Sequence, residues 1–204
     1  MTRFNIVLAI VLLAGLCTLH SSSMQAQAPQ SADAPRFAAD NELARPENYR
    51  EWIYLSSGIG MSYNAAANNA AGPANPPFDN VFVTPSAYRS FLQTGTWPEQ
   101  TMFVLELRGS ASEGSINKQG RFQQQVLGIE VEVKDSSRFP GKWAFFEFGR
   151  AAATSKPIAT TASCYSCHAQ NGAVDNTFVQ FYPTLADIAR QKGTFKEATS
   201  APRQ

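Results

Sequence analysis

The chain has 204 residues, with 17 lysines and arginines against 16 aspartates and glutamates and a formal net charge of +1. This balance argues against nucleic acid or an anionic membrane as the partner, because both attract strongly basic surfaces. The length that remains after loss of the N-terminal segment described next, about 175 residues, suits one ordinary domain with a sizeable core.

The N-terminus, residues 1–28, predicts a cleaved export signal. Arg3 supplies a positive charge, and residues 4–19 form an almost unbroken apolar run of the length of a signal-peptide core. The run is short for a bilayer span, and the small polar residues after it suit cleavage near residues 26–28. The sequence therefore predicts a periplasmic protein with no membrane segment after cleavage. Lipidation at Cys17 is the alternative.

Cleavage sharpens the inventory of side chains that bind metals or cofactors. Cys17 and His20 leave with the signal, so Cys164 and Cys167 are the only thiols that remain and His168 is the only imidazole. A metal or haem site in the mature chain therefore has one histidine available.

The domain organisation follows from composition. We expect a flexible N-terminal tail over residues 29–40, a single domain over residues 41–195, and a flexible C-terminal tail over residues 196–204. We see no internal repeat.

The first part of the domain reads mainly as β-strands. Segments rich in β-branched and aromatic residues alternate with segments rich in Gly, Pro, Asn and Ser at 68–77, 109–120 and 135–141. This pattern predicts an α+β fold, mainly antiparallel β-sheet with short helices. The expected strands are Trp52–Leu55, Val81–Val83, Thr101–Leu107, Phe122–Val133 and Trp143–Phe148.

Short helices are expected between the strands and at the end of the chain. Thr84 followed by proline marks a helix start, and Gly95 marks its stop. A single turn is expected over residues 46–50, and Asp175 is expected to cap another that runs through Phe181. A last helix is expected over residues 183–192, before Gly193.

The most informative motif is Cys164-Tyr165-Ser166-Cys167-His168. A C-x-x-C-H run places two thiols where each can add to a vinyl group of one haem, and it delivers the next imidazole to the iron. Half of a zinc site would need two further ligands, and a thioredoxin-like redox pair would need no His at that place. The motif therefore predicts one covalent haem c, attached through Cys164 and Cys167, with His168 as the proximal iron ligand. Its position near the C-terminus, with no Met after it, excludes the small helical class I cytochromes.

Several short blocks carry a resemblance to a known family. The chain resembles cytochrome P460 and its relative cytochrome c′-β over most of the mature sequence. The blocks are Arg45 to Trp52 (RPENYREW), Val81 to Tyr88 (VFVTPSAY), Gly95 to Thr101 (GTWPEQT), the C-x-x-C-H run, and Phe178 to Pro183 (FVQFYP). The resemblance implies a β-rich periplasmic homodimer that holds a five-coordinate haem and meets nitric oxide or hydroxylamine at the iron. Since either ligand turnover or electron transfer needs an electron-exchange partner, a soluble cytochrome is the redox partner that we expect.

One position departs from the family. In cytochrome P460 a lysine in the strand that corresponds to Thr101–Leu107 is bonded to a meso carbon of the haem, and Leu105 stands in its place here. Leucine has no nucleophile, so the cross-link and the electronic shift that it imposes are absent. Lys134 and Lys142 lie beside turn residues and are expected to be solvated. The chain therefore looks closer to the uncross-linked cytochrome c′-β type.

The distal wall of the haem follows from strand alternation. If Leu105 points at the haem, Thr101, Phe103 and Leu107 share its face, and the wall is apolar. Phe78 is placed over the haem by resemblance to the aromatic caps of cytochrome c′-β. For Phe78 and Phe103, plain core packing is the alternative interpretation.

Glu130 is the candidate proton acceptor. It matches an acidic residue of the P460 family near the distal pocket, where a carboxylate takes protons from hydroxylamine. The alternation of Gly128 to Val133 is equally typical of a solvated sheet face on which Glu130 and Glu132 lie.

The sixth coordination position distinguishes the function classes. Met61 and Met102 are the remaining strong-field candidates, and a Met ligand would make the protein a simple electron carrier. With neither bound, the iron is open to nitric oxide or a related nitrogen oxide. The sequence therefore predicts a periplasmic c-type cytochrome that binds such a ligand; a hydroxylamine-oxidising enzyme and an electron carrier are the alternatives.

Overall fold

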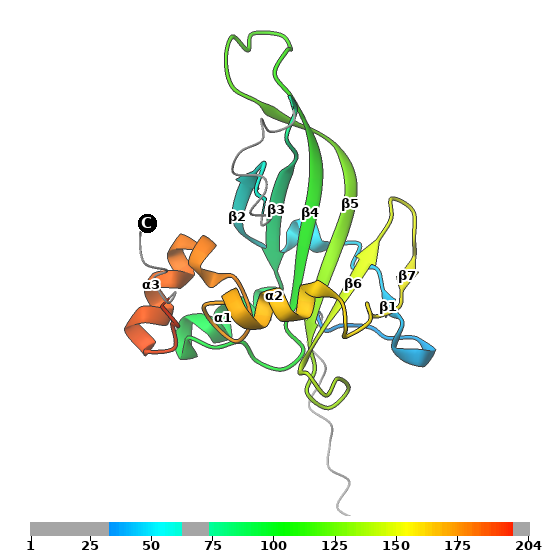
Figure 1. Ribbon diagram of the computed structural model, residues 1–204, viewed down its shortest axis with the longest axis vertical. Coiled ribbons are helices and arrows are strands. Elements are labelled where there is room, and N and C mark those ends of the chain that lie inside the picture. Colours follow the sequence, from blue (N-terminus) through cyan, green and yellow to red (C-terminus); the bar gives the residue numbers. More distant parts are fainter. Residues whose placement is uncertain (1–32, 63–73, 198–204) are drawn as a thin grey trace, which may run out of the picture. The chain divides into compact units, whose positions relative to one another are not determined.

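The computed structural model describes residues 33–62 and 74–197. The predicted signal peptide and its cleavage site lie outside these residues, as does the first part of the turn expected at 68–77. The described chain forms an antiparallel five-stranded sheet in the order β2-β3-β4-β5-β6, together with three short α-helices (Figure 1). The α+β fold expected from the sequence is confirmed.

The strands of the main sheet follow one another in sequence, so each pairs with its neighbour in the chain. Every predicted strand is present, and β2, β3 and β4 run further than expected. A two-stranded ribbon of Leu43–Ala44 (β1) and Thr154–Ser155 (β7) was not predicted, because two residues are too few to show alternation. The strands of the main sheet are Ile53–Ile59 (β2), Phe78–Val83 (β3), Met102–Ala111 (β4), Phe122–Lys134 (β5) and Trp143–Phe148 (β6).

Two of the helices begin and end as the sequence indicates. Helix α1 (Pro85–Thr94) and helix α3 (Pro183–Lys192) each start at a proline. Each ends before a left-handed glycine, Gly95 at φ 73° and Gly193 at φ 71°, a conformation that glycine adopts without steric cost. Helix α2 (Ser163–Asn171) carries the C-x-x-C-H motif.

The short 3-10 turns required corrections. The turn expected over residues 46–50 is Tyr49–Glu51 (η2), and a further turn, Ala39–Asn41 (η1), lies near the start of the described chain. Val179–Phe181 (η4) follows Phe178, not Asp175. Asp175 makes an ion pair with Lys134 instead of capping the turn.

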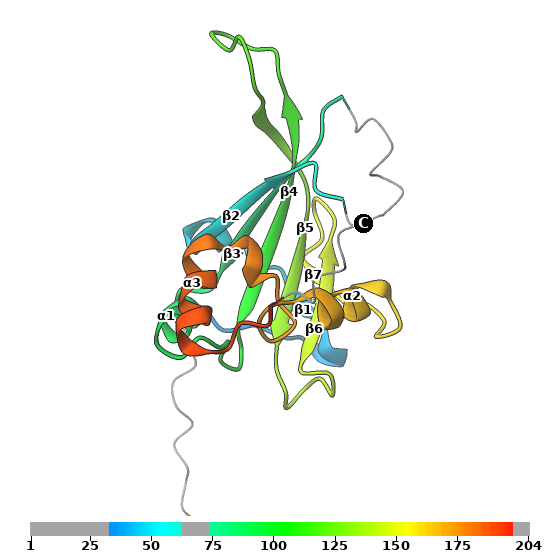
Figure 2. The same cartoon turned by 60° about the vertical axis from the view of Figure 1, so that its left-hand side comes forward.

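The two faces of the sheet carry different partners. Helix α2 crosses one face near the ends of β4 and β5, and Figures 1 and 2 show α1 and α3 beside it. We call this side the α2 face. Strand alternation places Phe103, Leu105, Glu130, Glu132 and Phe145 on it, because these residues pair with one another across β4, β5 and β6.

The opposite face packs against the N-terminal part of the described chain. Its core cluster consists of fully buried strand residues and of aromatic residues from 37–52 and 139. The strand members are Met102, Val104, Ile129, Val131, Val133, Ala144, Phe146 and Phe148.

The packed domain extends beyond the predicted limits of 41 and 195. The Asp33 carboxylate accepts hydrogen bonds from the backbone N–H and the hydroxyl of Ser86, and Phe37 packs on Phe139 and Phe146. At the other end, the Lys196 N–H donates to the Ala173 carbonyl. In the described residues, no helix is long and apolar enough to cross a membrane.

Candidate functional site

Helix α2 brings the two thiols and the imidazole of the motif together. Cys164, Cys167 and His168 are related by three- and four-residue spacings, which place their side chains on one side of a helix. Both cysteines are free and half-buried. The side chain of Asn171, one turn further on, donates to the carbonyl of Cys167 at 3.0 Å. The thiols therefore lie beside the imidazole on one short element, as attachment of a single haem requires.

The His168 ring is held in one orientation by a backbone carbonyl. Its Nδ1 lies 2.9 Å from the carbonyl oxygen of Asn176, and because a carbonyl only accepts, Nδ1 carries the proton. Burial lowers the pKa of His168, although the bond to Asn176 opposes this. The neutral ring then keeps its lone pair on Nε2, the state in which histidine binds a metal. Nε2 lies 3.5 Å from Oε1 of Glu132, on the α2 face of the sheet.

Aromatic rings surround the imidazole. Phe145 meets it edge-on at 4.6 Å between ring centroids, and Phe178 lies 4.4 Å away on a tilted plane. Phe145 also contacts Tyr165, whose hydroxyl donates to the Ile158 carbonyl at 3.1 Å. These contacts restrict rotation of the His168 ring, so Nε2 keeps its direction.

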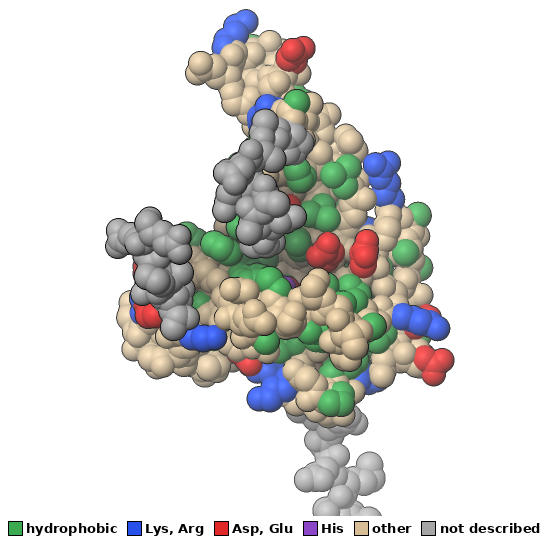
Figure 3. Space-filling view, in the orientation of Figure 1, with side chains coloured by type: hydrophobic (Ala, Val, Ile, Leu, Met, Phe, Trp, Pro, Cys, Tyr) green, Lys and Arg blue, Asp and Glu red, His purple; other side chains and the backbone are tan. Residues whose placement is uncertain are grey.

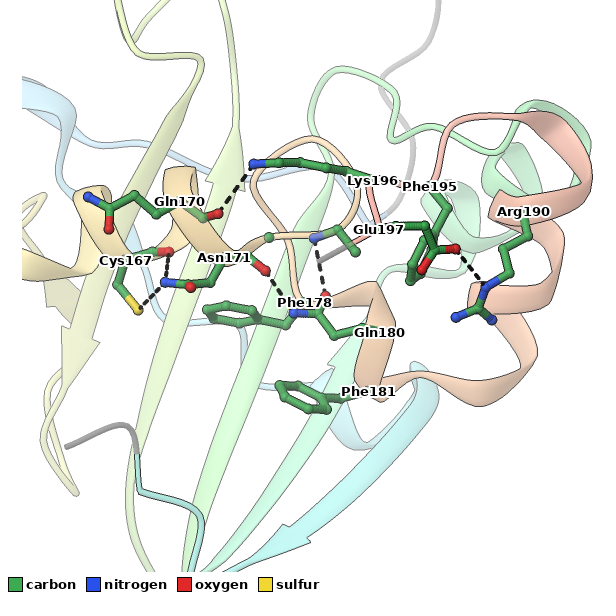
Figure 4. Close-up of a pocket in the computed structure, with 12 residues that line it drawn as sticks. Cys167, Gln170, Asn171, Phe178, Gln180, Phe181, Arg190, Phe195, Lys196 and Glu197 are labelled. Atoms are coloured by element: carbon green, nitrogen blue, oxygen red, sulfur yellow. Dashed lines mark hydrogen bonds and ion pairs between the residues drawn. The ribbon is translucent and has the colours of Figure 1, made fainter. Parts of the chain in front are cut away.

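A cavity borders the motif on the side of α3. It has a volume of about 540 Å³ and is lined by Cys167, Phe178, Phe181 and residues of the 170–173 and 195–197 segments. Figure 4 shows Cys167 at one end of the cavity and Arg190 with Glu197 at the other. Phe178 and Phe181 lie 6.1 Å apart, and Phe181 is 42% exposed. An exposed aromatic ring in a cavity that also contains a free thiol is the environment that a large planar apolar group would cover.

The α2 face continues as a wall beside this motif. Leu105 pairs with Val81 on one side and with Glu130 on the other, and it is half-buried. Leu105 therefore lies on the face that was predicted for it. In the space-filling view, hydrophobic and acidic side chains gather in a hollow above α2 (Figure 3).

Two of the predicted wall residues are corrected by the structure. Phe103 shares the face of Leu105 but is 3% exposed, and its ring packs against Trp97, Trp143 and Tyr182. It belongs to the core, which was the alternative interpretation. Phe78 pairs with Arg108, and alternation from Asp79 places it on the sheet face opposite Leu105.

Thr101 precedes β4 and does not line the wall. It is fully buried, and its hydroxyl donates to the Pro98 carbonyl at 2.7 Å. Leu107, in contrast, stays on the α2 face, where it pairs with Asp79 and Gly128.

Carboxylates gather on the same face. Glu130 is exposed and lies between Leu105 and Glu147, so the interpretation as a solvated sheet face stays open. Desolvation by the surrounding atoms, together with the charges of Glu147 and Asp79, raises its pKa. Burial, aided by the Glu130 charge, raises the pKa of Glu132 to about 8. Glu130 therefore faces the side of the sheet on which a proton acceptor would be needed, not the opposite face.

The two methionines differ in their access to the motif. Met102 is 3% exposed in the core cluster of the opposite face, so it is separated from His168 by the sheet. The sulfur of Met61 lies against Gly58, where an added Cβ would come within 2.3 Å of it. Gly58 pairs with Asp79, on the α2 face. Of the two candidates for a sixth ligand, only Met61 stays open.

Lys134 is not solvated as predicted. It is 12% exposed, its Nζ donates to the Trp97 carbonyl at 2.7 Å, and it forms an ion pair with Asp175. Lys142 is exposed, as expected. Lys134 is the last residue of β5, beyond Glu130, the partner of Leu105, and its Nζ is bound to Trp97 and Asp175, so it does not replace the missing lysine of the wall.

The donor set fits a haem c. Two thiols and a neutral imidazole, whose Nε2 lies on the side of Glu132, are the groups that such a cofactor uses. The described residues hold no group of three or more His, Cys, Asp or Glu side chains that could bind a metal ion by themselves. The sequence did not reveal the hydrogen bond to the Asn176 carbonyl or the position of Phe178 and Phe181 in the lining of the cavity. The only sequence signal for these two phenylalanines was their place in one of the family blocks.

Comparison with known proteins agrees with this donor set. A family model described as cytochrome P460 matches residues 46–179, which is more than half of the chain and includes the motif. Among curated proteins, none matches the chain.

Proposed function

This chain belongs to the cytochrome P460 family of haem-binding c-type cytochromes, and we propose that it holds one covalent haem c and binds nitric oxide or a related nitrogen oxide at an open iron. Cys164, Cys167 and His168 would hold the haem, which would supply an iron able to bind a small ligand and to exchange an electron. The observation that carries the proposal is the fixed orientation of His168 beside two free thiols.

The residues of α2 have separate tasks. The thiols of Cys164 and Cys167 hold the cofactor by thioether bonds. His168 supplies the proximal nitrogen, and its bond to the Asn176 carbonyl raises the basicity of that nitrogen. Phe145 and Phe178 hold the ring plane.

The apolar part of the α2 face favours the ligand. Leu105 and Val81 present apolar surface on this face, and neither side chain offers a hydrogen-bond donor, although Glu130 and Glu132 lie on the same face. Water beside Leu105 and Val81 would find no hydrogen-bond partner in their side chains, whereas nitric oxide needs none. Since Met102 lies on the opposite face, these contacts support an open position over a Met-capped one.

Two alternatives rest on specific observations. Glu130 lies on the α2 face with a raised pKa, which supports proton transfer from hydroxylamine and thus an oxidase. The place of Met61 beside Gly58 supports an electron carrier. Leu105 argues against the first alternative, because the lysine cross-link that accompanies such chemistry in the family is absent.

The wider setting is part of the proposal. Export by residues 1–28 would deliver the chain to the periplasm, where haem c is attached. The homodimer implied by the resemblance and the soluble cytochrome partner remain predictions.

A titration separates the three functions. We expect the reduced protein to give a high-spin, five-coordinate spectrum and to bind nitric oxide with one equivalent per chain, and Met61→Leu should leave both results unchanged. A low-spin spectrum that is lost in Met61→Leu would establish the electron carrier. Hydroxylamine turnover with an artificial electron acceptor, lost in Glu130→Gln but kept in Glu147→Gln, would establish the enzyme.

A further inference from the structure

A partly buried lysine, Lys134, lies beside the loop that supports His168. The Nζ of Lys134, at the end of β5, is bound to the Trp97 carbonyl at 2.7 Å and to the carboxylate of Asp175. The side chains of this ion pair are 12% and 24% exposed. None of its atoms belongs to the motif, and a partly buried pair that links distant segments needs a reason, because desolvation opposes it.

The reason lies in the backbone next to Asp175. Asp175 and Asn176 are consecutive residues at φ 47° and 63°, in the left-handed region, which Asp and Asn adopt more readily than other residues except glycine. This preference does not fix where the turn lies relative to His168, so the contacts of the turn with neighbouring segments decide that. The carbonyl of Asn176, in this turn, is the group that accepts the hydrogen bond from His168 Nδ1.

Backbone hydrogen bonds close the turn, because the Thr177 N–H donates to the Val174 carbonyl at 2.8 Å and the Ala173 N–H donates to the Thr177 carbonyl at 2.9 Å. Three further contacts hold it from different sides. The hydroxyl of Thr177 donates to the Val174 carbonyl at 2.6 Å and accepts the Trp97 indole N–H at 2.8 Å. Gly172 lies so close that an added Cβ would be 2.5 Å from the carbonyl carbon of Asn176. The ion pair of Lys134 with Asp175 is the third contact and the only charged one of the three.

We propose that Lys134 and Asp175 are positioning residues that set the strength of the proximal iron ligand. The pair holds the Asn176 carbonyl at hydrogen-bonding distance from Nδ1, and this bond increases electron donation from Nε2. The inference rests on the proposed function, in which His168 binds the iron. Stronger donation favours ferric over ferrous iron, so the pair lowers the reduction potential.

The experiment removes one charge at a time from the haem-loaded protein. Lys134→Met keeps the length of the side chain, and Asp175→Asn keeps its shape and tolerates a left-handed backbone. Lys118→Met, at an exposed lysine in the β4–β5 hairpin, is the matched control. The readouts are the iron–histidine stretching frequency of the reduced protein, by resonance Raman spectroscopy, and the reduction potential.

We expect both charge-removing variants to lower the stretching frequency and to raise the potential, while the control changes neither. The ferric-to-ferrous equilibrium should shift about three- to tenfold, and tenfold corresponds to 59 mV for one electron. Gly172→Ala displaces the same carbonyl by steric contact and should move both readouts in the same direction.

Asp175→Asn should fold even if Lys134→Met does not, because asparagine has the same shape as aspartate. If it folds with haem attached and leaves both readouts unchanged, the pair is only structural and the inference is wrong. The proposed function requires an iron–histidine band in the wild-type protein that disappears in His168→Ala. If no such band is found, the proposed function itself is wrong, and the inference is wrong with it.

Discussion

Neutralising Glu106 should destabilise the fold without changing the haem. Glu106 lies next to Leu105 in β4 but points to the opposite face, where it is 3% exposed. Its carboxylate accepts hydrogen bonds from Tyr49 and Arg50, each at 2.5 Å, and lies 3.0 Å from Arg108. Burial opposes its ionisation, but the hydrogen bonds and the Arg108 charge outweigh burial and lower the pKa.

The magnitude follows from the exposure of the partners. Removing one member of a buried ion pair costs about 3 to 5 kcal/mol, because the other charge stays buried. The Arg50 side chain is 54% exposed and is solvated again when Glu106 is neutralised, so the loss of this ion pair contributes little to the change in the free energy of unfolding. We therefore expect Glu106→Gln to lower the free energy of unfolding by about 3 kcal/mol, or the melting temperature by roughly 6 to 12 °C for a chain of this size.

The assay is thermal unfolding of the haem-loaded protein, followed by circular dichroism, with the visible spectrum as the second readout. Glu51→Gln, an exposed glutamate in η2, is the matched control and should stay within about 0.5 kcal/mol. Because the folded-state pKa of Glu106 is lowered, its contribution is present above the ordinary glutamate pKa and is lost as the pH falls below it. The gap between wild type and variant should narrow in acid. A loss below about 1 kcal/mol, or a changed haem spectrum, would refute the division of tasks between the two faces.

The remaining predictions concern the α2 face. Leu105→Lys should give partial lysine-to-haem cross-linking on exposure to peroxide, seen as a red-shifted Soret band, whereas Leu107→Lys should give none; equal cross-linking by both would contradict the placement of Leu105. Phe103→Ala should cost about 3 to 5 kcal/mol of stability, as expected of a core cavity, with little change in ligand-binding rate; faster carbon monoxide binding at unchanged stability would restore its distal role. Glu130→Gln should leave nitric oxide binding intact, and loss of binding would show that the carboxylate holds the ligand.

Much of the fold was predictable because local chemistry determines it. Proline at the helix start and glycine after its end fixed α1 and α3, and β-branched runs fixed the five strands. The C-x-x-C-H motif identified the donor set without any structure. The family resemblance assigned Leu105 and Glu130 to the same haem side, and in the structure they pair directly across β4 and β5.

The wrong predictions concern residues whose environment depends on their exact position in a strand or on a partner far away in the sequence. Alternation gives the face of Phe103 but not its depth, which depends on Trp97, Trp143 and Tyr182 packing over it. Phe78 was placed over the haem by resemblance alone, because it precedes the predicted strand Val81–Val83; β3 begins at Phe78, and only this start reveals which face the side chain takes.

Long-range contacts were equally hidden from sequence reasoning. Lys134 looked solvated beside turn residues, but its partner Asp175 is brought to it by the fold. The Asn176 carbonyl was not visible either, because a backbone group has no sequence signature.

Mass spectrometry of the purified protein tests the central claim most directly. After exposure to acidic organic solvent, the peptide that contains Cys164, Cys167 and His168 should carry the full mass of one haem, joined by two thioether bonds and by no lysine bond. Haem that is extracted by the solvent, or zinc bound in its place, would contradict the account.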